Sequence, residues 1–596
     1  MPSYKAPVED VLFLLNDVFP IKNLTHLSGF AEATPDLVEA ILVQAAKLCE
    51  ETLLPLNQSG DRLGCVLGED RSVTTPKGFK DAYRAFTEGG WIGLAADPEF
   101  GGQGLPYTLA AIVDEFASSA NMAFAMYPGL SQGALAALLR HGSEEQKRIF
   151  VPKLISGTWS GTMNLTESHC GTDLGLLKTK AVPNADGSFT ITGEKIFISA
   201  GEHDLAENII HLVLARIEGA PQGVKGISLF VVPKILIEAD GALGARNKVS
   251  CGAIEHKMGI HANATCVMNY DGAKGWLVGE RDRGLNAMFV MMNEARIGVA
   301  IQGLAISEAA YQNAAAYAKE RLQGRAAAGP KAPEKPADPI IVHPDVRRNL
   351  LTIRAFNEAA RALVIWTALK SDVAHRSSDK REAEAAAHHL GLLTPVLKGV
   401  LTDIGFDNTV KAQQIFGGHG YIEEWGMEQF VRDARITMIY EGANGIQALD
   451  LVGRKLAKDG GRAVMAFFNE VKTFIKDNEG EPALSPYLTP LKQGLSHLEK
   501  STLWFLQNAM AKPDNALAGS YDYMHLFGLA ALGYMWAHMA KAALAAQSAG
   551  AHVAMAKTKL LLGRFFMDRL MPETGTYLAR ITSGAETIMA LAPEQF

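Results

Sequence analysis

Residues Met163–Asp173 read MNLTESHCGTD. This stretch is dense in small and hydroxyl-bearing residues, and such a loop can bind a polar ring edge or a phosphate through hydroxyls and backbone N–H groups. A simpler interpretation is a turn capped by Thr and Asp side chains. The stretch marks a change along the chain, because the sequence is helical in pattern before it and strand-like after it.

Residues 35–160 carry apolar residues at helical spacing, for example in DLVEAILVQAAKLCEETLLPL. After the stretch, short runs such as GSFTITG, IIHLVLARI and GISLFVVP are rich in β-branched and aromatic residues and end at Gly, Asn or Asp. They do not alternate with helices, which favours an antiparallel β-domain. The helical pattern returns near residue 285 and continues to the end, broken by a proline-rich loop at 330–339 (PKAPEKPADP).

The sequence therefore predicts a mainly α-helical protein with a central antiparallel β-domain. We expect five regions: an N-terminal extension at 1–34, a helical domain at 35–160, the β-domain at 161–284, a helical bundle at 285–455 and a further helical domain at 456–596.

The composition restricts the class of protein. The 596 residues have a formal net charge of −7 and no long basic run, which argues against nucleic acid as a partner. None of the five cysteines belongs to a CxxC pair, so neither a disulfide framework nor a metal site is expected. This use of cysteine is typical of a reducing, cytoplasmic protein.

The sequence predicts no integral membrane span and no signal peptide. The N-terminal residues MPSYKAPVEDVLFLLNDVF lack a basic n-region. The most membrane-like stretch, Leu526–Ala546, is interrupted by His538 and Lys541. A spanning helix requires about 20 nearly uninterrupted apolar residues, so we expect this stretch to be a buried helix.

Two further motifs are weak when each is considered alone. Lys195–Ser199 (KIFIS) places an aromatic residue two positions before a hydroxyl, and it is also an ordinary strand sequence. Gln414–Tyr421 (QIFGGHGY) has enough glycine to let a ligand approach the backbone closely. It could equally be the end of a helix followed by a turn, and it lacks the lysine and the spacing of a nucleotide-binding fingerprint.

The fourth motif is Arg432–Gln447 (RDARITMIYEGANGIQ), in which Glu441 ends an apolar run and precedes Gly442. An apolar environment disfavours the charged carboxylate, which raises its pKa toward the range of a useful general base. The alternative is an acid placed near a helix N-terminus, where the helix dipole stabilises it.

In this order, the four motifs resemble the acyl-CoA dehydrogenase family, whose corresponding patterns are T-E-x-x-x-G-[ST]-D, K-x-[WF]-I-[TS], Q-x-F-G-G-x-G and I-Y-E-G-x-x-x-I-Q. Residues 93–106 (GLAADPEFGGQGLP) and 317–325 (YAKERLQGR) resemble two more elements of the family. The resemblance covers residues from about 35 to 455 and implies the family's fold, with a helical domain, a β-domain and a helical bundle, and FAD as cofactor. The N-terminal extension and the additional C-terminal helices look most like the bacterial 3-methylmercaptopropionyl-CoA dehydrogenase-like subgroup.

The resemblance also implies residue roles. Glu441 would be the catalytic base, and its backbone N–H together with a flavin ribityl hydroxyl would polarise the thioester carbonyl. Phe197 stands where many members have Trp, and Ser199 where most have Thr. The implied FAD contacts are Met163, Leu165, Thr166, Gly171, Thr172, Phe197, Ser199, Arg321, His343, Gln414, Gly418, Ala443 and Gly445. The implied substrate contacts are Thr172, Asn293, Arg296 and Gly442.

The implied reaction is α,β-dehydrogenation of an acyl-CoA to the trans-2-enoyl-CoA, with electrons passed to an electron-transferring flavoprotein. The strip Gln414–Gly418 would reach the FAD of a second subunit, which implies a homodimer or a larger homo-oligomer. The subgroup suggests 3-methylmercaptopropionyl-CoA and dimethylsulfoniopropionate degradation. A medium- or long-chain fatty acyl-CoA dehydrogenase of β-oxidation and an acyl-CoA oxidase remain open alternatives.

A hypothesis from another class is a serine hydrolase, because Gly129–Gly133 (GLSQG) matches the G-x-S-x-G elbow. That elbow belongs on a strand-to-helix turn of a parallel sheet. The flanking sequence here is helical, which argues against it.

Overall fold

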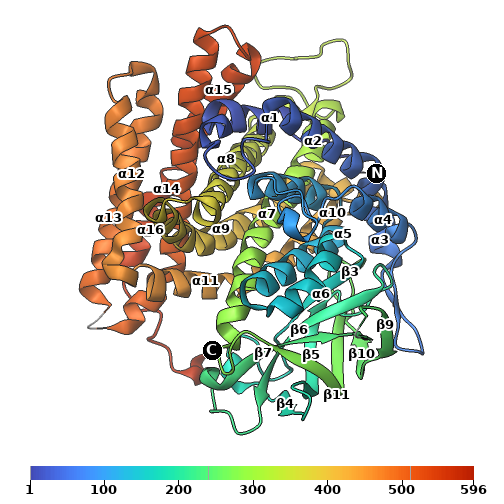
Figure 1. The fold of residues 1–596 in the computed structure, drawn as a ribbon. Coiled ribbons are helices and arrows are strands. Elements are labelled where there is room, and N and C mark those ends of the chain that lie inside the picture. Colours follow the sequence, from blue (N-terminus) through green and yellow to red (C-terminus); the bar gives the residue numbers. More distant parts are fainter. Residues whose placement is uncertain (1, 239, 510–511) are drawn as a thin grey trace. The chain divides into compact units, whose positions relative to one another are not determined.

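The fold comes from a computed structural model that describes residues 2–238, 240–509 and 512–596 (Figure 1). The chain forms two compact units. One is Gln44–Gly298, and the other combines Met1–Val43 with Val299–Phe596. The boundaries fall inside two helices, α2 (Pro35–Leu48) and α7 (Gly284–Glu320).

The helices of the unit Gln44–Gly298 surround α5 (Tyr107–His141), a 35-residue helix whose side chains are buried over most of its length. The helical spacing of apolar residues in the sequence predicts this burial, and α5 packs against the sheet strand β3. The next helix begins with a capping box between Ser143 and Gln146. The remaining helices of this unit are α3 (Asn57–Leu63), α4 (Phe79–Glu88) and α6 (Glu144–Ile155).

The β-domain of the same unit is a seven-stranded sheet in which β11 pairs with β5, β7 and β10, and β6 pairs with β3, β4 and β7. Through β4–β5 pairing, the strands β11–β5–β4–β6–β7 close into a ring, and β10 and β3 remain at the two ends of the strand order as edge strands. The strands are β3 (Trp159–Asn164), β4 (Lys180–Pro183), β5 (Phe189–Ser199), β6 (Asn208–Ile217), β7 (Ile227–Pro233), β10 (Val249–Ile254) and β11 (Thr265–Val278). Two short ribbons pair β1 (Val66–Leu67) with β2 (Val73–Thr74) and β8 (Ile235–Ile237) with β9 (Leu243–Arg246).

Most pairings in the sheet are antiparallel, as the sequence predicts, but two are parallel. β6 runs parallel to both β3 and β4, while the other pairs in the sheet are antiparallel. At least one other strand lies in sequence between the members of each parallel pair, so the connection is long enough for a parallel arrangement. The composition of the strands carries no signal for this choice.

The other unit contains three long helices, α8 (Pro344–Arg376), α9 (Lys380–Ile415) and α14 (Pro513–Ser548). Figure 1 shows α12–α16, in orange and red, beside α8 and α9, in yellow, and α14 packs on both of these helices and on α11. Its remaining helices are α1 (Val8–Phe13), α10 (Met427–Arg435), α11 (Asn444–Asp450), α12 (Arg462–Asn478), α13 (Ser485–Asn508), α15 (Val553–Arg569) and α16 (Glu573–Thr582).

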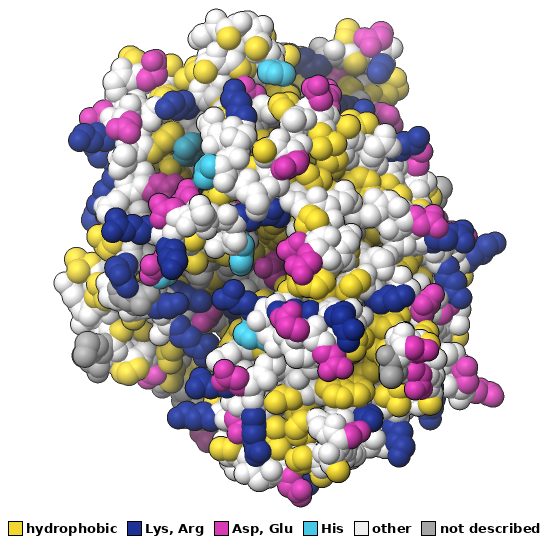
Figure 2. All heavy atoms as spheres, in the orientation of Figure 1, with side chains coloured by type: hydrophobic (Ala, Val, Ile, Leu, Met, Phe, Trp, Pro, Cys, Tyr) yellow, Lys and Arg dark blue, Asp and Glu magenta, His cyan; other side chains and the backbone are white. Residues whose placement is uncertain are grey.

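The segment Leu526–Ala546 lies in α14, and its side chains are mostly buried. Two helices in the described part of the chain are long and apolar enough to cross a membrane by length and composition alone, namely α5 and α7. More than half of the most apolar window of each is buried within the fold, as it is in core helices. Figure 2 shows acidic and basic side chains intermixed over the visible face, with apolar side chains between them.

A buried charge network joins the N-terminal extension to the C-terminal helices in the unit that holds both ends of the chain. Lys559 on α15 binds Asp10 on α1, and its Nζ lies 2.7 Å from Oε2 of Glu358 on α8. Arg361 on α8 also binds Asp10, at 2.6 Å, and reaches Glu308 on α7 at 3.2 Å. Burial opposes ionisation of Asp10, but Lys559 and Arg361 hold the pKa of Asp10 below its ordinary value.

We predict that Lys559→Met destabilises this unit by about 1.5–3 kcal/mol, because Asp10 and Glu358 each lose one charged partner and retain only Arg361 and Arg354, respectively. Chemical unfolding followed by tryptophan fluorescence measures the change. The contribution of Asp10 is present above pH 3.8, its ordinary pKa, and is lost as the pH falls through the lowered pKa. The matched control is Lys557→Met, which alters an exposed lysine on the same helix. Equal stability of the two variants would show that the charge network does not stabilise this unit.

Candidate active site

The loop Met163–Asp173 is fixed to strand β5 by a buried ion pair. Lys195 on β5 is fully buried, and its Nζ donates to Oε1 of Glu167 and to the backbone carbonyl of Leu165, both at 2.9 Å. The backbone N–H of Ile196 donates to the carbonyl of Thr166, also at 2.9 Å. The Met163–Asp173 loop and the Lys195–Ser199 segment, which are separate motifs in the sequence, are therefore joined in the structure.

The carboxylate of Glu167 is saturated with hydrogen bonds. Besides Lys195, it accepts bonds from the backbone N–H groups of Lys178 and Thr179 and from the Thr179 hydroxyl. Burial raises the pKa of Glu167, but Lys195 and these donors together hold it below its ordinary value. Burial lowers the pKa of Lys195, and the attraction of Glu167 offsets that effect in part.

Strand β5 turns Phe197 outward at a β-bulge. Ile198 pairs with Cys266 and Lys195 with Met268, so Ile196 and Phe197 together face Val267. Phe197 has a φ of 59°, which is uncommon for a residue other than glycine, and its side chain is 60% exposed. Bulges commonly redirect a side chain next to an active site, and this one presents an aromatic face beside the Met163–Asp173 loop.

The other site residues predicted in this unit lie on the same loop, the same strand or α7. Met163, Leu165, Thr166 and Ser199 are half-buried, and Gly171 and Thr172 are exposed. On α7, Asn293 is exposed and Arg296 is buried.

The sequence did not single out a carboxylate pair formed by Asp114 on α5 and Glu294 on α7. Burial, reinforced by the like charge of Glu294, raises the pKa of Asp114 to about 7. Glu294 adjoins Asn293, one of the predicted substrate contacts. Asp114 and Glu115 interrupt the apolar run LAAIVDEFA, and acidic residues in such a run are the signal that could have identified the site.

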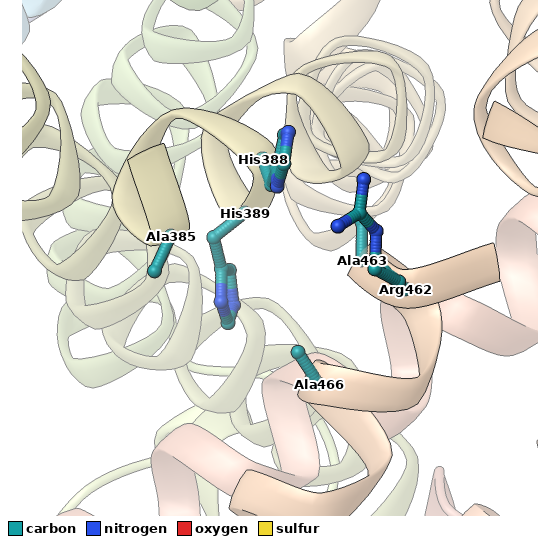
Figure 3. Close-up of a pocket in the computed structure, with 6 residues that line it drawn as sticks. All are labelled: Ala385, His388, His389, Arg462, Ala463 and Ala466. Atoms are coloured by element: carbon teal, nitrogen blue, oxygen red, sulfur yellow. The ribbon is translucent and has the colours of Figure 1, made fainter. Parts of the chain in front are cut away.

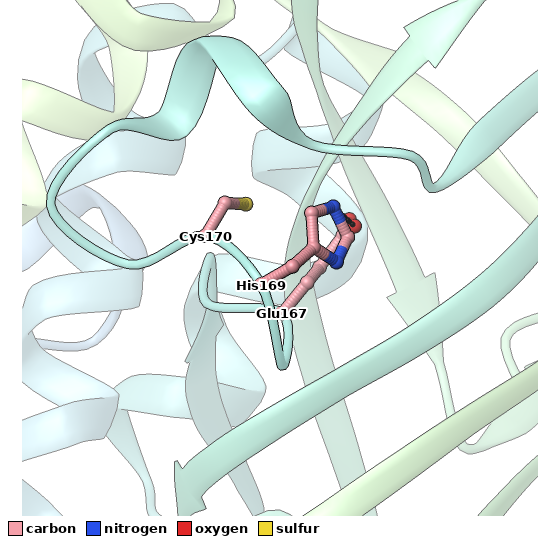
Figure 4. Close-up of side chains that lie close together, drawn as sticks. All are labelled: Glu167, His169 and Cys170. Carbon is pink, nitrogen blue, oxygen red and sulfur yellow. Dashed lines mark ion pairs between the residues drawn. The ribbon is translucent and has the colours of Figure 1, made fainter.

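Three potential metal ligands, Glu167, His169 and Cys170, lie close together on the loop (Figure 4). His169 Nε2 is 3.7 Å from Oε2 of Glu167. Four hydrogen-bond donors already occupy the Glu167 carboxylate, which disfavours its binding of a metal ion. Burial also raises the pKa of the Cys170 thiol. This arrangement is more consistent with the ion pair between Glu167 and Lys195 than with a metal centre.

In the other unit, Glu441 lies in a short loop between η11 (Ile436–Met438) and α11. The φ angles of Glu441 and Gly442 are 58° and 88°, so both residues are left-handed. For glutamate this backbone is strained, and such strain persists only where surrounding contacts impose it. Glu441 is half-buried. Two positions before it, the side chain of Ile439 is 49% exposed.

The contacts that hold this turn come from two buried polar side chains, Lys398 and Gln447. Lys398 on α9 donates from Nζ to the carbonyl of Gly442 at 2.9 Å and to Oδ1 of Asn444 at 2.8 Å. Gln447 Nε2 donates to the carbonyls of Glu441 and Gly442 at 3.2 and 3.0 Å. The sequence prediction did not include Lys398. The feature that could have identified it is a lone lysine within the apolar run PVLKGVL.

The predicted strip Gln414–Gly418 begins in the last two residues of α9 and continues into η9 (Gly417–Tyr421). Gln414, Gly417 and Gly418 are exposed, and a Cβ at either glycine would meet open space. Next to the strip, Tyr421 is 83% exposed, and His419 stacks on the exposed Trp425 with ring centroids 4.6 Å apart. The exposed apolar side chains of this region are Tyr421, Ile422 and Trp425.

Arg321 and His343 lie at the two ends of the loop between α7 and α8, and Gln323 links them. The Arg321 carbonyl accepts from the backbone N–H of Ile340 at 2.8 Å, while His343 Nε2 donates to the Gln323 carbonyl at 2.9 Å. Arg321 is exposed and His343 half-buried. The remaining predicted residues, Ala443 and Gly445, are exposed in the Glu441 loop and at the start of α11.

A small cavity of about 130 Å³ lies elsewhere in this unit, between α9 and α12 (Figure 3). His388, His389 and Arg462 line it together with alanine side chains, and none of these residues was predicted to be in the site. Burial lowers the pKa of His389 to about 3, which keeps the imidazole neutral.

The serine hydrolase hypothesis is wrong. Ser131 lies inside α5 and is fully buried. Its hydroxyl donates to the carbonyl of Tyr127 at 3.3 Å and accepts from the backbone N–H of Gly161 at 3.0 Å. A nucleophile elbow requires an exposed serine on a strand-to-helix turn.

Comparison with known proteins agrees with this fold and these motifs. Three domain models of the acyl-CoA dehydrogenase family match consecutive parts of the chain: the N-terminal domain at 39–158, the middle domain at 162–273 and the C-terminal domain at 282–456. A fourth model, described as acetyl-CoA dehydrogenase C-terminal like, matches 467–592. The chain belongs to the acyl-CoA dehydrogenase family, and it is an FAD-dependent oxidoreductase.

Two curated relatives match nearly the whole chain. The 3-methylmercaptopropionyl-CoA dehydrogenase of Ruegeria pomeroyi is 41% identical over 98% of this chain and 99% of its own length. The broad-specificity linear acyl-CoA dehydrogenase of Mycobacterium tuberculosis is 34% identical over 96% of each chain. The solved acyl-CoA dehydrogenase of Bacillus anthracis, complexed with FAD, has the same fold with a TM-score of 0.74, at 21% identity, and the match covers 96% of this chain and 91% of that one.

The residues of this chain fit FAD. The exposed face of Phe197 at the bulge offers a surface for a flat ring, next to the backbone of a loop rich in hydroxyls. In the other unit, open space at Gly418 and Gly445 allows a ligand to approach the backbone closely.

We predict that Lys195→Met destabilises the unit Gln44–Gly298 by about 3–5 kcal/mol, because it leaves the buried Glu167 without its cation. Hydrogen exchange of the peptide covering 163–173 should accelerate in the same variant. The control is Lys180→Met, which alters an exposed lysine on the neighbouring strand β4. Unchanged exchange in Lys195→Met would show that the ion pair does not hold the loop.

Proposed function

We propose that Glu441 is the base that removes the α-proton of an acyl-CoA thioester. The observation that carries this proposal is the left-handed turn at Glu441 and Gly442, held by buried donors from Lys398 and Gln447. These contacts fix the backbone while the carboxylate side chain remains partly accessible. A fixed backbone and an accessible carboxylate are what a positioned general base requires.

The α-hydrogen of a thioester is a weak acid, so the carbonyl must be polarised while negative charge develops. We assign this role to the backbone N–H of Glu441, whose direction is set by the same left-handed turn. FAD, when bound, accepts the hydride that leaves Cβ. Glu441 then holds the proton that it has taken from Cα.

We propose that the loop Met163–Thr172 and the bulge residues Phe197 and Ser199 form the protein surface against the flavin ring. The support is the tether of this loop to β5 and the outward aromatic face of Phe197. Arg321 and His343 would bind the pyrophosphate and adenosine portion. The other proposed FAD contacts are Gln414, Gly418, Ala443 and Gly445, and the proposed substrate contacts are Thr172, Asn293, Arg296 and Gly442.

We propose 3-methylmercaptopropionyl-CoA as the substrate, and the 41% identity to the Ruegeria pomeroyi enzyme supports this proposal. A broad range of linear acyl-CoAs is the second candidate, supported by the Mycobacterium tuberculosis relative. Both substrates undergo the same removal of hydrogen across Cα–Cβ, so the base would be common to them.

We further propose a homodimer or larger homo-oligomer, because the strip Gln414–Gly418 lies beside the exposed aromatic side chains of Tyr421 and Trp425. Aromatic residues of this kind are enriched in the cores of protein interfaces. Electron-transferring flavoprotein is the proposed acceptor, and the cytoplasm is the proposed compartment.

We predict that Glu441→Gln lowers the rate of flavin bleaching by acyl-CoA about 10²–10⁴-fold, because glutamine keeps the size of the side chain but cannot accept the proton. Stopped-flow absorbance of the anaerobic holoenzyme measures this rate. FAD content should remain about one per chain. The control is Glu424→Gln in the exposed segment η10 (Glu423–Trp425), which should bleach at the wild-type rate. Near wild-type bleaching by Glu441→Gln would show that another group is the base.

We predict that a panel of acyl-CoAs assayed with an artificial electron acceptor gives the highest kcat/KM for 3-methylmercaptopropionyl-CoA, followed by short and medium linear chains. A preference for long chains would contradict the subgroup assignment. Oxygen consumption is measured in parallel without the acceptor, since turnover supported by oxygen alone would identify an acyl-CoA oxidase.

A further inference from the structure

The carboxylate of Asp403 on α9 connects the C-terminal helices to the loop that carries Glu441. On one side, its Oδ2 accepts hydrogen bonds from the Tyr521 hydroxyl and from His525 Nε2, the latter at 2.8 Å. Both donors lie on α14. On the other side, its Oδ1 accepts from Asn444 Nδ2 at 2.6 Å. One carboxylate on α9 therefore links α14 to α11.

Asn444 continues the connection to the turn. Its Oδ1 accepts from Lys398 Nζ at 2.8 Å, and the same ammonium group donates to the carbonyl of Gly442 at 2.9 Å. Thr402 also accepts from Asn444, at 2.8 Å. The hydrogen bonds thus run from His525 and Tyr521 through Asp403, Asn444 and Lys398 to the residue after the proposed base.

Tyr521, at the outer end of this series of hydrogen bonds, is 41% exposed, but the other polar groups are almost completely removed from water. Lys398 and Thr402 are fully buried, Asn444 is 4% exposed, and Asp403 and His525 are each 8% exposed. In such an environment hydrogen bonds are strong, and an unsatisfied partner is costly. If Oδ2 of Asp403 loses its two donors on α14, the carboxylate must rotate or admit water. Asn444 then loses one fixed acceptor and keeps Thr402 and the Gly399 carbonyl.

We propose that Tyr521 and His525 are positioning residues for the Glu441 loop, so that the C-terminal helices form part of the catalytic machinery. This inference rests on the assignment of Glu441 as the base. The C-terminal helices thereby act on kcat through Asp403, in addition to burying the apolar surface of α8 and α9.

The test compares two double variants of the full-length holoenzyme. The first, Tyr521→Phe with His525→Leu, removes both donors to Asp403 and approximately conserves side-chain size. The matched control, Tyr523→Phe with His497→Leu, removes a tyrosine bond of α14 and a histidine bond of the neighbouring α13. Tyr523 bonds Thr502 at 2.7 Å and His497 bonds Thr574 at 3.0 Å, so neither bond reaches α9. A third variant, His525→Gln, retains an amide donor and serves as the conservative replacement.

Four quantities are measured: kcat and KM with the best acyl-CoA of the panel, FAD per chain, and hydrogen exchange of the peptide covering 441–447. A displacement of about 1 Å in a catalytic group can cost about 10²-fold in rate. We expect kcat of the first double variant to fall at least tenfold, with KM and FAD content within twofold of wild type. Its 441–447 peptide should exchange faster. His525→Gln should recover most of kcat.

The control variant separates positioning from general stability. It should melt at a lower temperature than wild type, but its kcat and its exchange at 441–447 should be unchanged. If it loses kcat to the same extent as the first double variant, the effect is one of stability and the inference is overturned.

Two other outcomes would also overturn the inference, and they differ in cause. Unchanged exchange and unchanged kcat in Tyr521→Phe with His525→Leu would show that the hydrogen-bonded chain does not hold the loop. Faster exchange of the 441–447 peptide together with wild-type kcat would show that these hydrogen bonds hold the loop in the wild-type protein. It would also show that the loop does not carry the catalytic base. In that case Glu441→Gln would also retain activity, so the failure would belong to the assignment of the base.

Discussion

The structure depends on buried ammonium groups that hold the backbone of functional loops. Lys398 donates to the carbonyl of Gly442, and Lys195 donates to the carbonyl of Leu165. Each lysine is fully buried, and each also binds a side-chain oxygen, of Asn444 and Glu167 respectively. A buried charge is tolerated only when it is paired and hydrogen-bonded, so these lysines strongly constrain the loops to which they donate.

Buried lysines that donate to loop carbonyls have a different role in each unit. In the unit Gln44–Gly298, Lys195 holds a hydroxyl-rich loop against a strand that presents Phe197 outward, which leaves backbone and aromatic surface for a planar cofactor. In the other unit, Lys398 and Gln447 hold a strained turn whose carboxylate remains accessible. Loops fixed in this way lose little entropy when substrate binds, which is how positioning lowers a barrier.

The four motifs and their order along the chain were visible in the sequence, because each combines residue types with clear chemical uses. The left-handed backbone of Phe197 and Glu441 was not visible, since neither residue favours that conformation and tertiary contacts impose it. The parallel pairing of β6 with β3 and β4 was also hidden, because strand composition does not encode direction. The connection from His525 to Asn444 joins residues far apart in the chain and could be found only in the folded structure. The domain limits and the roles of individual site residues stay predictions.

In the proposed mechanism, a fixed turn places the carboxylate of Glu441 at the α-carbon of an acyl-CoA. The most direct measurement is a crystal structure of the protein with FAD and a thioether analogue of acyl-CoA that cannot be dehydrogenated. We predict a carboxylate oxygen of Glu441 at about 3–3.5 Å from the carbon that corresponds to Cα, which is the separation of a near-attack geometry. A different carboxylate at that carbon, or a Glu441 side chain directed away from it, would contradict the account.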